Sequence, residues 1–240
     1  MKTTMLIARR EFRAYLTSPM AYIIACVFLV LIGSLFVWYF ESTNYSNTSI
    51  NGYLDVWGNL VLMLFAAVLA MRLVAEEKKL GTWELLLTAP VRDTEVVLGK
   101  FLGSLGVLVA MLALTFYFPL LLWAFGGDPD TGPIVTGYLG LFLLGAASLS
   151  IGLFASSVTS NQIVAAVVAG GILAVLYFVG AAGDSMSGAI GDILSYISLS
   201  SHFPDFINGI IDTRAIVYYL SVVALFLFMT VRSIETSRWS

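Results

Sequence analysis

Six long apolar stretches, separated by short polar segments, dominate the chain. They cover approximately residues 20–40, 54–71, 101–125, 134–158, 163–182 and 215–231. Each falls within the range of about 17–25 residues that a helix rising 1.5 Å per residue needs to cross a bilayer. The pattern predicts an all-α integral membrane protein, residues 1–240 forming one transmembrane domain. The first stretch is expected to remain as a membrane helix and not to be removed as a signal peptide.

Apolar and basic positions before the first stretch take opposite faces of a predicted helix over residues 2–17. The apolar face is Met5, Ala8, Phe12, Tyr15 and Leu16, and the basic face is Lys2, Arg9, Arg10 and Arg13. This amphipathic pattern is typical of a helix that lies in the headgroup layer. Its candidate interfacial residues are Arg9, Arg10, Phe12 and Arg13. A solvated tail is the alternative.

Helix-breaking and small residues modify the later stretches. Pro119 is expected to kink the third span or to mark its outer end. Small residues of the fourth span allow close helix contacts in lipid; they are Gly137, Gly140, Gly145, Ser148 and Gly152. Between the fifth and sixth spans, residues 183–212 hold only short amphipathic pieces. These predict broken helices at the outer interface.

Charge is sparse and unevenly distributed. Only 11% of residues are charged against 59% hydrophobic, with a mean hydropathy of +0.93, as expected for a membrane protein. Eleven of the twelve Lys and Arg residues lie in the termini and inner loops, and Arg214 alone lies opposite. The positive-inside rule therefore places both termini in the cytoplasm of a multi-pass protein, with a bacterial inner membrane as the expected location.

The sequence lacks several kinds of functional chemistry. The apolar cores carry no Asp, Glu, Lys, Arg or His, which argues against a proton-coupled carrier or voltage sensor. No Gly-x-x-x-x-Gly-Lys-Ser/Thr phosphate loop occurs. Neither the lone Cys26 nor the lone His202 belongs to a metal-binding or catalytic pattern. We expect no enzyme activity, bound cofactor, metal site or nucleic-acid partner, so that any energy must arrive through another protein.

The loop between the second and third spans carries the most distinctive stretch. The charged run 76–79 is followed by Gly81, which is expected to break the helix, and by Thr82, which can cap a new one. Residues 83–89 then form about two turns before Pro90. So short an apolar helix is unstable alone in water, so we expect it to dock in a groove of a partner. Lying on the inner leaflet is the alternative.

Residues 76–91 and 95–100 resemble the coupling region of ATP-binding-cassette (ABC) exporter permeases of the ABC-2 class. Shared features are a Glu-rich run, Gly-Thr, an acidic-Leu-Leu core, a Pro and a later Gly-Lys. The resemblance implies a coupling helix whose ATPase-contacting residues are Glu76, Glu77, Gly81, Thr82, Trp83, Glu84, Leu85, Leu86, Thr88 and Pro90. Trp83 departs from the aliphatic residue common there.

The resemblance further implies two ABC ATPase subunits that bind ATP and Mg, and a second permease copy or paralogue. Within the class, the chain is most similar to gliding-motility-type and nitrous-oxide-reductase-maturation-type permeases. The expected function is therefore the permease subunit of an ATP-driven exporter surrounded by membrane lipid. A mechanotransmission anchor that acts on a periplasmic subunit without moving a substrate is the alternative, and an assembly scaffold is a third.

Overall fold

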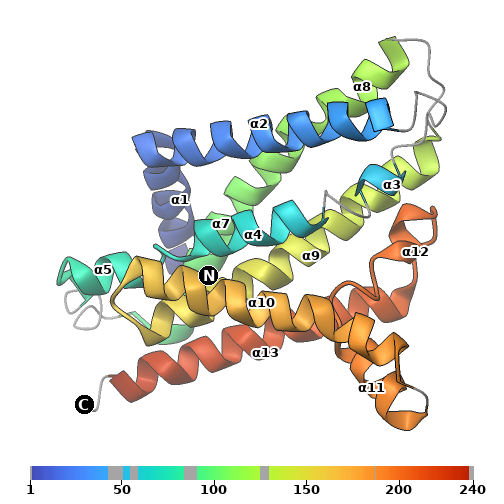
Figure 1. Ribbon diagram of the computed structural model, residues 1–240. Coiled ribbons are helices and arrows are strands. Elements are labelled where there is room, and N and C mark those ends of the chain that lie inside the picture. The colour runs from blue at the N-terminus through green and yellow to red at the C-terminus, as the bar shows by residue number, and fades with distance from the viewer. Residues whose placement is uncertain are drawn as a thin grey trace.

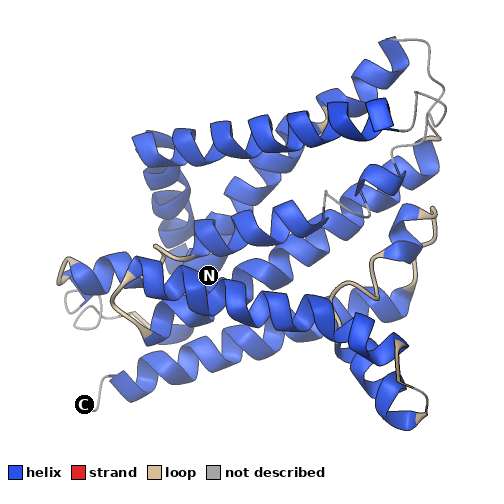
Figure 2. Cartoon of the chain, viewed as in Figure 1, coloured by secondary structure: helices blue, strands red, loops and turns tan. Residues whose placement is uncertain are grey.

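The computed structural model describes residues 2–42, 51–54, 59–83, 91–124, 130–186 and 188–237, and these residues form helices and no strand (Figure 1, Figure 2). The helices are α1 (Lys2–Thr17), α2 (Pro19–Ser42), α3 (Asn51–Tyr53), α4 (Asn59–Ala70), α5 (Ala75–Lys79), α7 (Asp93–Thr115), α8 (Tyr117–Ala124), α9 (Thr131–Val158), α10 (Gln162–Asp184), α11 (Ala189–Ile197), α12 (Pro204–Ile207) and α13 (Thr213–Ser237).

Six helical segments in the described part of the chain are long and apolar enough to cross a membrane, which confirms the predicted architecture. Two of these helices run beyond their apolar stretches at the end where charged residues begin. The second continues from Asn59 to Lys79, and the third starts at Asp93. The third span begins before its apolar stretch, where Glu95 accepts a hydrogen bond from the backbone nitrogen of Arg92 and so caps the first turn.

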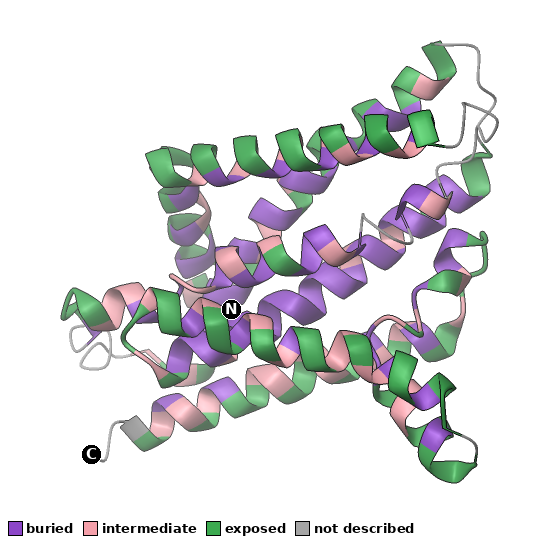
Figure 3. Cartoon of the chain, in the orientation of Figure 1, coloured by how far each residue is buried: buried purple, intermediate pink, exposed green. Residues whose placement is uncertain are grey.

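Helix α9 is the centre of the bundle (Figure 1, Figure 3). Within its most apolar 18 residues 83% are buried, against 22% for α2 and 17% for α13. It packs against α4, α7, α10, α12 and α13. A Cβ at Gly140, Gly145 or Gly152 would lie within 3 Å of side chains of Phe206, Leu108 and Ala70, respectively. The predicted small-residue contacts therefore exist, and each brings α9 close to a different neighbour.

Pro119 breaks the third span, and a side chain of another helix compensates for the hydrogen bond that is lost at the break. A proline at this position leaves the carbonyl of Thr115 without its helical N–H donor. The hydroxyl of Tyr138 donates a hydrogen bond to that carbonyl at 2.9 Å. The chain therefore changes from α7 to α8 at Phe116 without leaving the carbonyl of Thr115 unpaired.

The segment between the fifth and sixth spans is broken, as predicted, into α11 and α12. Phe203 and Phe206 are fully buried, and Phe206 packs against the glycine side of α9. The hydroxyl of Tyr219 donates to the carbonyl of Leu199 at 2.8 Å, which ties the segment to α13. His202 stacks on the ring of Tyr218 with centroids 3.9 Å apart. The segment is thus held on the bundle by aromatic side chains.

Candidate functional site

Basic side chains gather at one end of the bundle, where α1, α5, the start of α7 and the end of α13 lie (Figure 1). We call this the basic end. Its described cations are Lys2, Arg9, Arg10, Arg13, Arg72, Lys78, Lys79, Arg92, Lys100 and Arg232. Helix α1 runs across this end at a steep angle to α2 (Figure 1). The basic end therefore contains both the predicted interfacial helix and the start of the predicted coupling region.

The coupling region begins on α5 and turns sharply after it. Gly81 has a φ of 71°, a left-handed conformation that favours glycine, and its N–H bonds to the carbonyl of Lys78. This is the predicted helix break. Thr82 differs from expectation: it is already helical, and its hydroxyl donates to the carbonyl of Glu77 at 3.3 Å. Trp83 is 5% exposed, and no described residue accepts a hydrogen bond from its indole N–H.

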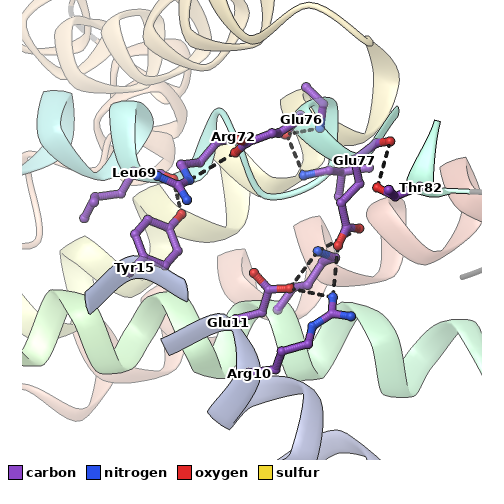
Figure 4. Close-up of polar contacts among 12 residues, drawn as sticks. Arg10, Glu11, Tyr15, Leu69, Arg72, Glu76, Glu77 and Thr82 are labelled. Carbon is purple, nitrogen blue, oxygen red and sulfur yellow. Dashed lines mark hydrogen bonds and ion pairs between the residues drawn. The ribbon is translucent and has the colours of Figure 1, made fainter. Parts of the chain in front are cut away.

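Four charged side chains of α1, α5 and α7 form a closed ring of ion pairs, and Figure 4 labels three of them, Arg10, Glu11 and Glu77. Lys100 of α7 lies 3.0 Å from a carboxylate oxygen of Glu11 and 2.9 Å from one of Glu77. Arg10 lies 3.0 Å from the same two carboxylates. We call this set the charge ring. It joins α1, α5 and α7 through two cations and two anions, so the buried charges compensate one another.

Lys100 is the deepest member of the charge ring, at 1% exposure. Burial by itself would raise the pKa of the Glu11 carboxyl, but Lys100 and Arg10 outweigh it, so that pKa lies below its ordinary value. Burial would lower the pKa of Arg10, and the two carboxylates hold it above its ordinary value instead. Arg10 and Glu11 are therefore held in their charged forms around neutral pH.

Glycines on α7 allow α1 to approach closely enough to form the charge ring. A Cβ at Gly99 would lie 2.7 Å from Ile7, and one at Gly103 would lie 2.6 Å from the Cβ of Glu11. A Cβ at Gly106 would lie 3.1 Å from the ring of Phe12, which packs over this glycine. These glycines recur about once per helical turn, so they form one shallow face on which α1 rests.

A second group of contacts surrounds Arg72, in the turn between α4 and α5 (Figure 4). Its guanidinium pairs with Glu76 at 3.2 Å, donates to the hydroxyl of Ser18 at 3.2 Å, and lies 4.6 Å from the centre of the Tyr15 ring. Between these contacts and the charge ring is a hollow of about 570 Å³. Its lining is mostly charged or polar, and Leu73 and Leu80 are among its apolar residues.

The structure brings some predicted residues together and leaves others apart. Arg10 of the interfacial set contacts Glu77 of the coupling set, whereas Glu76 pairs with Arg72. Phe12 packs on α7, whereas Arg9 and Arg13 are exposed. The remaining predicted coupling residues fall outside the described part of the chain; they are Glu84, Leu85, Leu86, Thr88 and Pro90.

Sequence reasoning missed Glu11 and Lys100. The buried face of α1 contains Ile7, Ala8, Glu11 and Tyr15, whereas Met5 and Leu16 of the predicted apolar face are exposed. Glu11 is one helical turn from both Ile7 and Tyr15, so the signal was an acid within an apolar stripe. Such an acid requires a basic partner when buried. Among the described residues, no three His, Cys, Asp or Glu side chains gather as metal ligands would.

Comparisons with known proteins agree on one assignment. A family profile described as "ABC-2 family transporter protein" matches residues 5–234. Over 117 residues, the chain is 34% identical to proteins of Escherichia coli strains K12 and O157:H7, both described as "Probable multidrug ABC transporter permease YbhS". That alignment covers 46% of this chain and only 28% of each relative.

Proposed function

The chain belongs to the ABC-2 transporter family, and on that premise we propose that it is the permease subunit of an ATP-driven exporter. It is a multi-pass membrane protein and a transmembrane subunit of an ABC transporter. Its sequence contains no phosphate-binding loop of the Gly-x-x-x-x-Gly-Lys-Ser/Thr type. We propose that ATP and Mg bind to two separate ATPase subunits, and that the energy reaches this chain by contact.

The charge ring is the observation that carries the proposal. Glu77 stands six residues before the predicted coupling helix begins at Trp83 and pairs with Lys100 on α7 and Arg10 on α1. The pair with Lys100 is shielded from water, and such an ion pair resists separation more than an exposed one does, whereas the pair with Arg10 is exposed. A push on residues 76–90 is therefore passed to the interfacial helix and to the third span together. This is the connection that a coupling element requires.

Two copies of the chain, or one copy and a paralogue, are proposed to pair in the membrane. Helices α2 and α10 bury little of their surface within one chain, although they are strongly apolar. Closure of the ATPases would tilt the spans and open a path between the two permeases. The basic end would face the cytoplasm, as the positive-inside rule requires. An apolar path suits amphipathic cargo, and the description of the relatives as multidrug permeases supports the same class.

The test uses the chain reconstituted in proteoliposomes with its ATPase. Glu84→Lys and Leu85→Asp are expected to abolish stimulation of ATP turnover by cargo while leaving insertion in the membrane intact. Glu235→Gln is the matched control, because Glu235 forms an exposed ion pair with Arg232 at the same end of the bundle. Normal coupling in both test variants would remove the coupling assignment.

A mechanotransmission anchor is the second candidate, and one observation favours it. Helix α11 carries exposed apolar side chains at the end of the bundle opposite the basic end, among them Ile190, Ile193 and Tyr196. Such a surface suits a periplasmic subunit. The two functions differ in what stimulates ATP turnover in liposomes. Stimulation by cargo supports the exporter, and stimulation only by a periplasmic subunit supports the anchor.

A further inference from the structure

The second span bends between α4 and α5, over residues 71–74. In a regular helix the N–H of Leu73 bonds to the carbonyl of Leu69, and the N–H of Ala75 bonds to that of Met71. Here the N–H of Leu73 bonds to the carbonyl of Ala70 at 3.1 Å instead. The carbonyls of Leu69 and Met71 are left for other donors.

The hydroxyl of Ser156, on α9, is the donor to one of these two carbonyls. It donates to the carbonyl of Met71 at 2.8 Å and accepts from the N–H of Ala75 at 3.0 Å. It also accepts from the N–H of Val74 at 3.1 Å. The hydroxyl thus stands between two backbone groups that would otherwise bond to each other. Insertion of a side chain in this manner is a recognised cause of helix kinks.

The hydroxyl of Tyr15, on α1, is the donor to the other carbonyl. It donates to the carbonyl of Leu69 at 2.6 Å. The side chain is buried, and burial raises the pKa of its phenol, so that Tyr15 remains a neutral donor. The bend is therefore contacted from two sides, by α1 and by α9.

Close helix packing brings Ser156 into reach. Gly152 lies one helical turn before it on the same face of α9, and a Cβ there would be 2.4 Å from the Cβ of Ala70. Beyond the bend, Lys78 donates to the carbonyl of Ser157. The position of α9 relative to α4 therefore decides whether the hydroxyl remains inserted.

We propose that Ser156 and Tyr15 are positioning residues that hold this bend and so set the direction of the coupling segment. Withdrawal of the Ser156 hydroxyl lets the N–H of Ala75 bond directly to the carbonyl of Met71, and the helix straightens. The role in coupling rests on the proposed function, whereas the bend itself does not. A shift of α9 changes the direction of α5, and a push on α5 displaces α9.

A distance measurement on the purified full chain in nanodiscs tests this inference. Spin labels are placed at Leu80→Cys, after α5, and at Met229→Cys, on α13, in a Cys26→Ser background; all three side chains are exposed. Ser156→Ala and Tyr15→Phe each remove only a hydroxyl. Both are expected to shift the distance distribution, and the double variant is expected to shift it further. Tyr15→Phe provides a separate result if Ser156→Ala does not fold.

Three control variants separate the bend from general effects of lost hydroxyls. Ser156→Thr keeps the hydroxyl and is expected to retain the wild-type distances. Ser150→Ala removes a hydroxyl that bonds within α9, and Tyr138→Phe removes one that bonds to a carbonyl at the other helix break. Both should leave the distances unchanged. Wild-type distances in both Ser156→Ala and Tyr15→Phe would overturn the inference.

Amide hydrogen exchange distinguishes straightening from the simple loss of a bond. In Ser156→Ala, the inference expects Ala75 to stay protected, because it gains the carbonyl of Met71. If the hydroxyl only satisfied two amides, Val74 and Ala75 would both exchange about tenfold faster, and the inference would be wrong. A chain that shows the distance shift but binds no ATPase would remove the exporter proposal and leave the bend assignment standing.

Discussion

At the scale of single residues, Lys100 has the most demanding environment among the described charges. It is almost fully buried, and its ammonium is compensated by the carboxylates of Glu11 and Glu77. Charged groups in such surroundings are tolerated only when they are paired. The three residues come from positions 11, 77 and 100, so the compensation of the Lys100 charge depends on the fold as a whole.

Lys100→Met is expected to destabilise the protein strongly. The substitution retains the apolar length of the side chain but leaves Glu11 and Glu77 with Arg10 as the one remaining cation of the charge ring. Removing one partner of a buried ion pair costs about 3–5 kcal/mol. Thermal unfolding of the purified chain in detergent measures the effect. In the double variant Lys100→Met with Glu11→Gln, part of the loss should be recovered. Equal unfolding temperatures for Lys100→Met and the wild type would contradict the buried ion pairs.

Stability is also expected to depend on pH through Glu11. Its pKa is lowered in the folded state, so its contribution is fully present above the ordinary value of 4.5 and is lost as pH falls through the folded pKa. In a series of measurements from pH 6 downward, the unfolding temperature should therefore begin to decrease once the pH is below about 4.5. Glu11→Gln should start from a lower stability and show a shallower fall. A parallel fall in both proteins would exclude this role for Glu11.

At the scale of elements, the contact of α1 with α7 depends on glycines of α7, which have no side chain to keep the two helices apart. Gly99, Gly103 and Gly106 give α7 a face on which the backbone of α1 approaches closely. Without it, Glu11 would not reach Lys100. Helix α1 is therefore packed on the bundle by shape as well as attracted by charge.

Gly103→Ala is expected to push α1 away from α7. Its Cβ would lie 2.6 Å from the Cβ of Glu11 and 3.0 Å from the carbonyl of Ala8, and such overpacking costs about 1–3 kcal/mol. Thermal unfolding and protease sensitivity of α1 measure the effect. Gly170→Ala on α10 is the control, because its Cβ meets nothing within 4 Å, and it should be neutral or slightly stabilising. Equal behaviour of the two variants would disprove the close contact.

At the scale of the whole molecule, the bundle has a basic end and an acidic end around the central helix α9. The described acids of the opposite end are Glu41, Asp130, Asp184, Asp192, Asp205 and Asp212. From this separation of charge, the positive-inside rule predicts that the basic end faces the cytoplasm and the acidic end the opposite side of the membrane. It also separates the charge ring from the segment that holds α11 and α12.

Cysteine labelling tests the resulting orientation. In a Cys26→Ser background, Leu80→Cys at the basic end should react with a membrane-impermeant maleimide only in inverted vesicles. Ile193→Cys on α11 should react in intact cells whose outer membrane has been permeabilised. Both side chains are exposed, so access to them depends on the side of the membrane. The reverse labelling pattern would place the basic end outside.

Much of the fold was predictable because it depends on local patterns. Runs of apolar residues determine which segments can span a bilayer, and Gly81 and Pro119 break helices wherever they occur. The amphipathic pattern of residues 2–17 also predicted α1. Its buried face was wrong in part, because a periodic pattern assigns Glu11 to water unless its partner is known.

The sequence by itself determined the number of spans, the position of the helix breaks and the separation of charge, since each follows from the transfer of residues between water and lipid. Only the tertiary structure decided which charges meet and where the second span bends. Glu11 and Lys100, or Ser156 and Met71, are far apart along the chain, and packing of small residues brings them together. No local propensity encodes such distances, because they depend on how three helices pack at once.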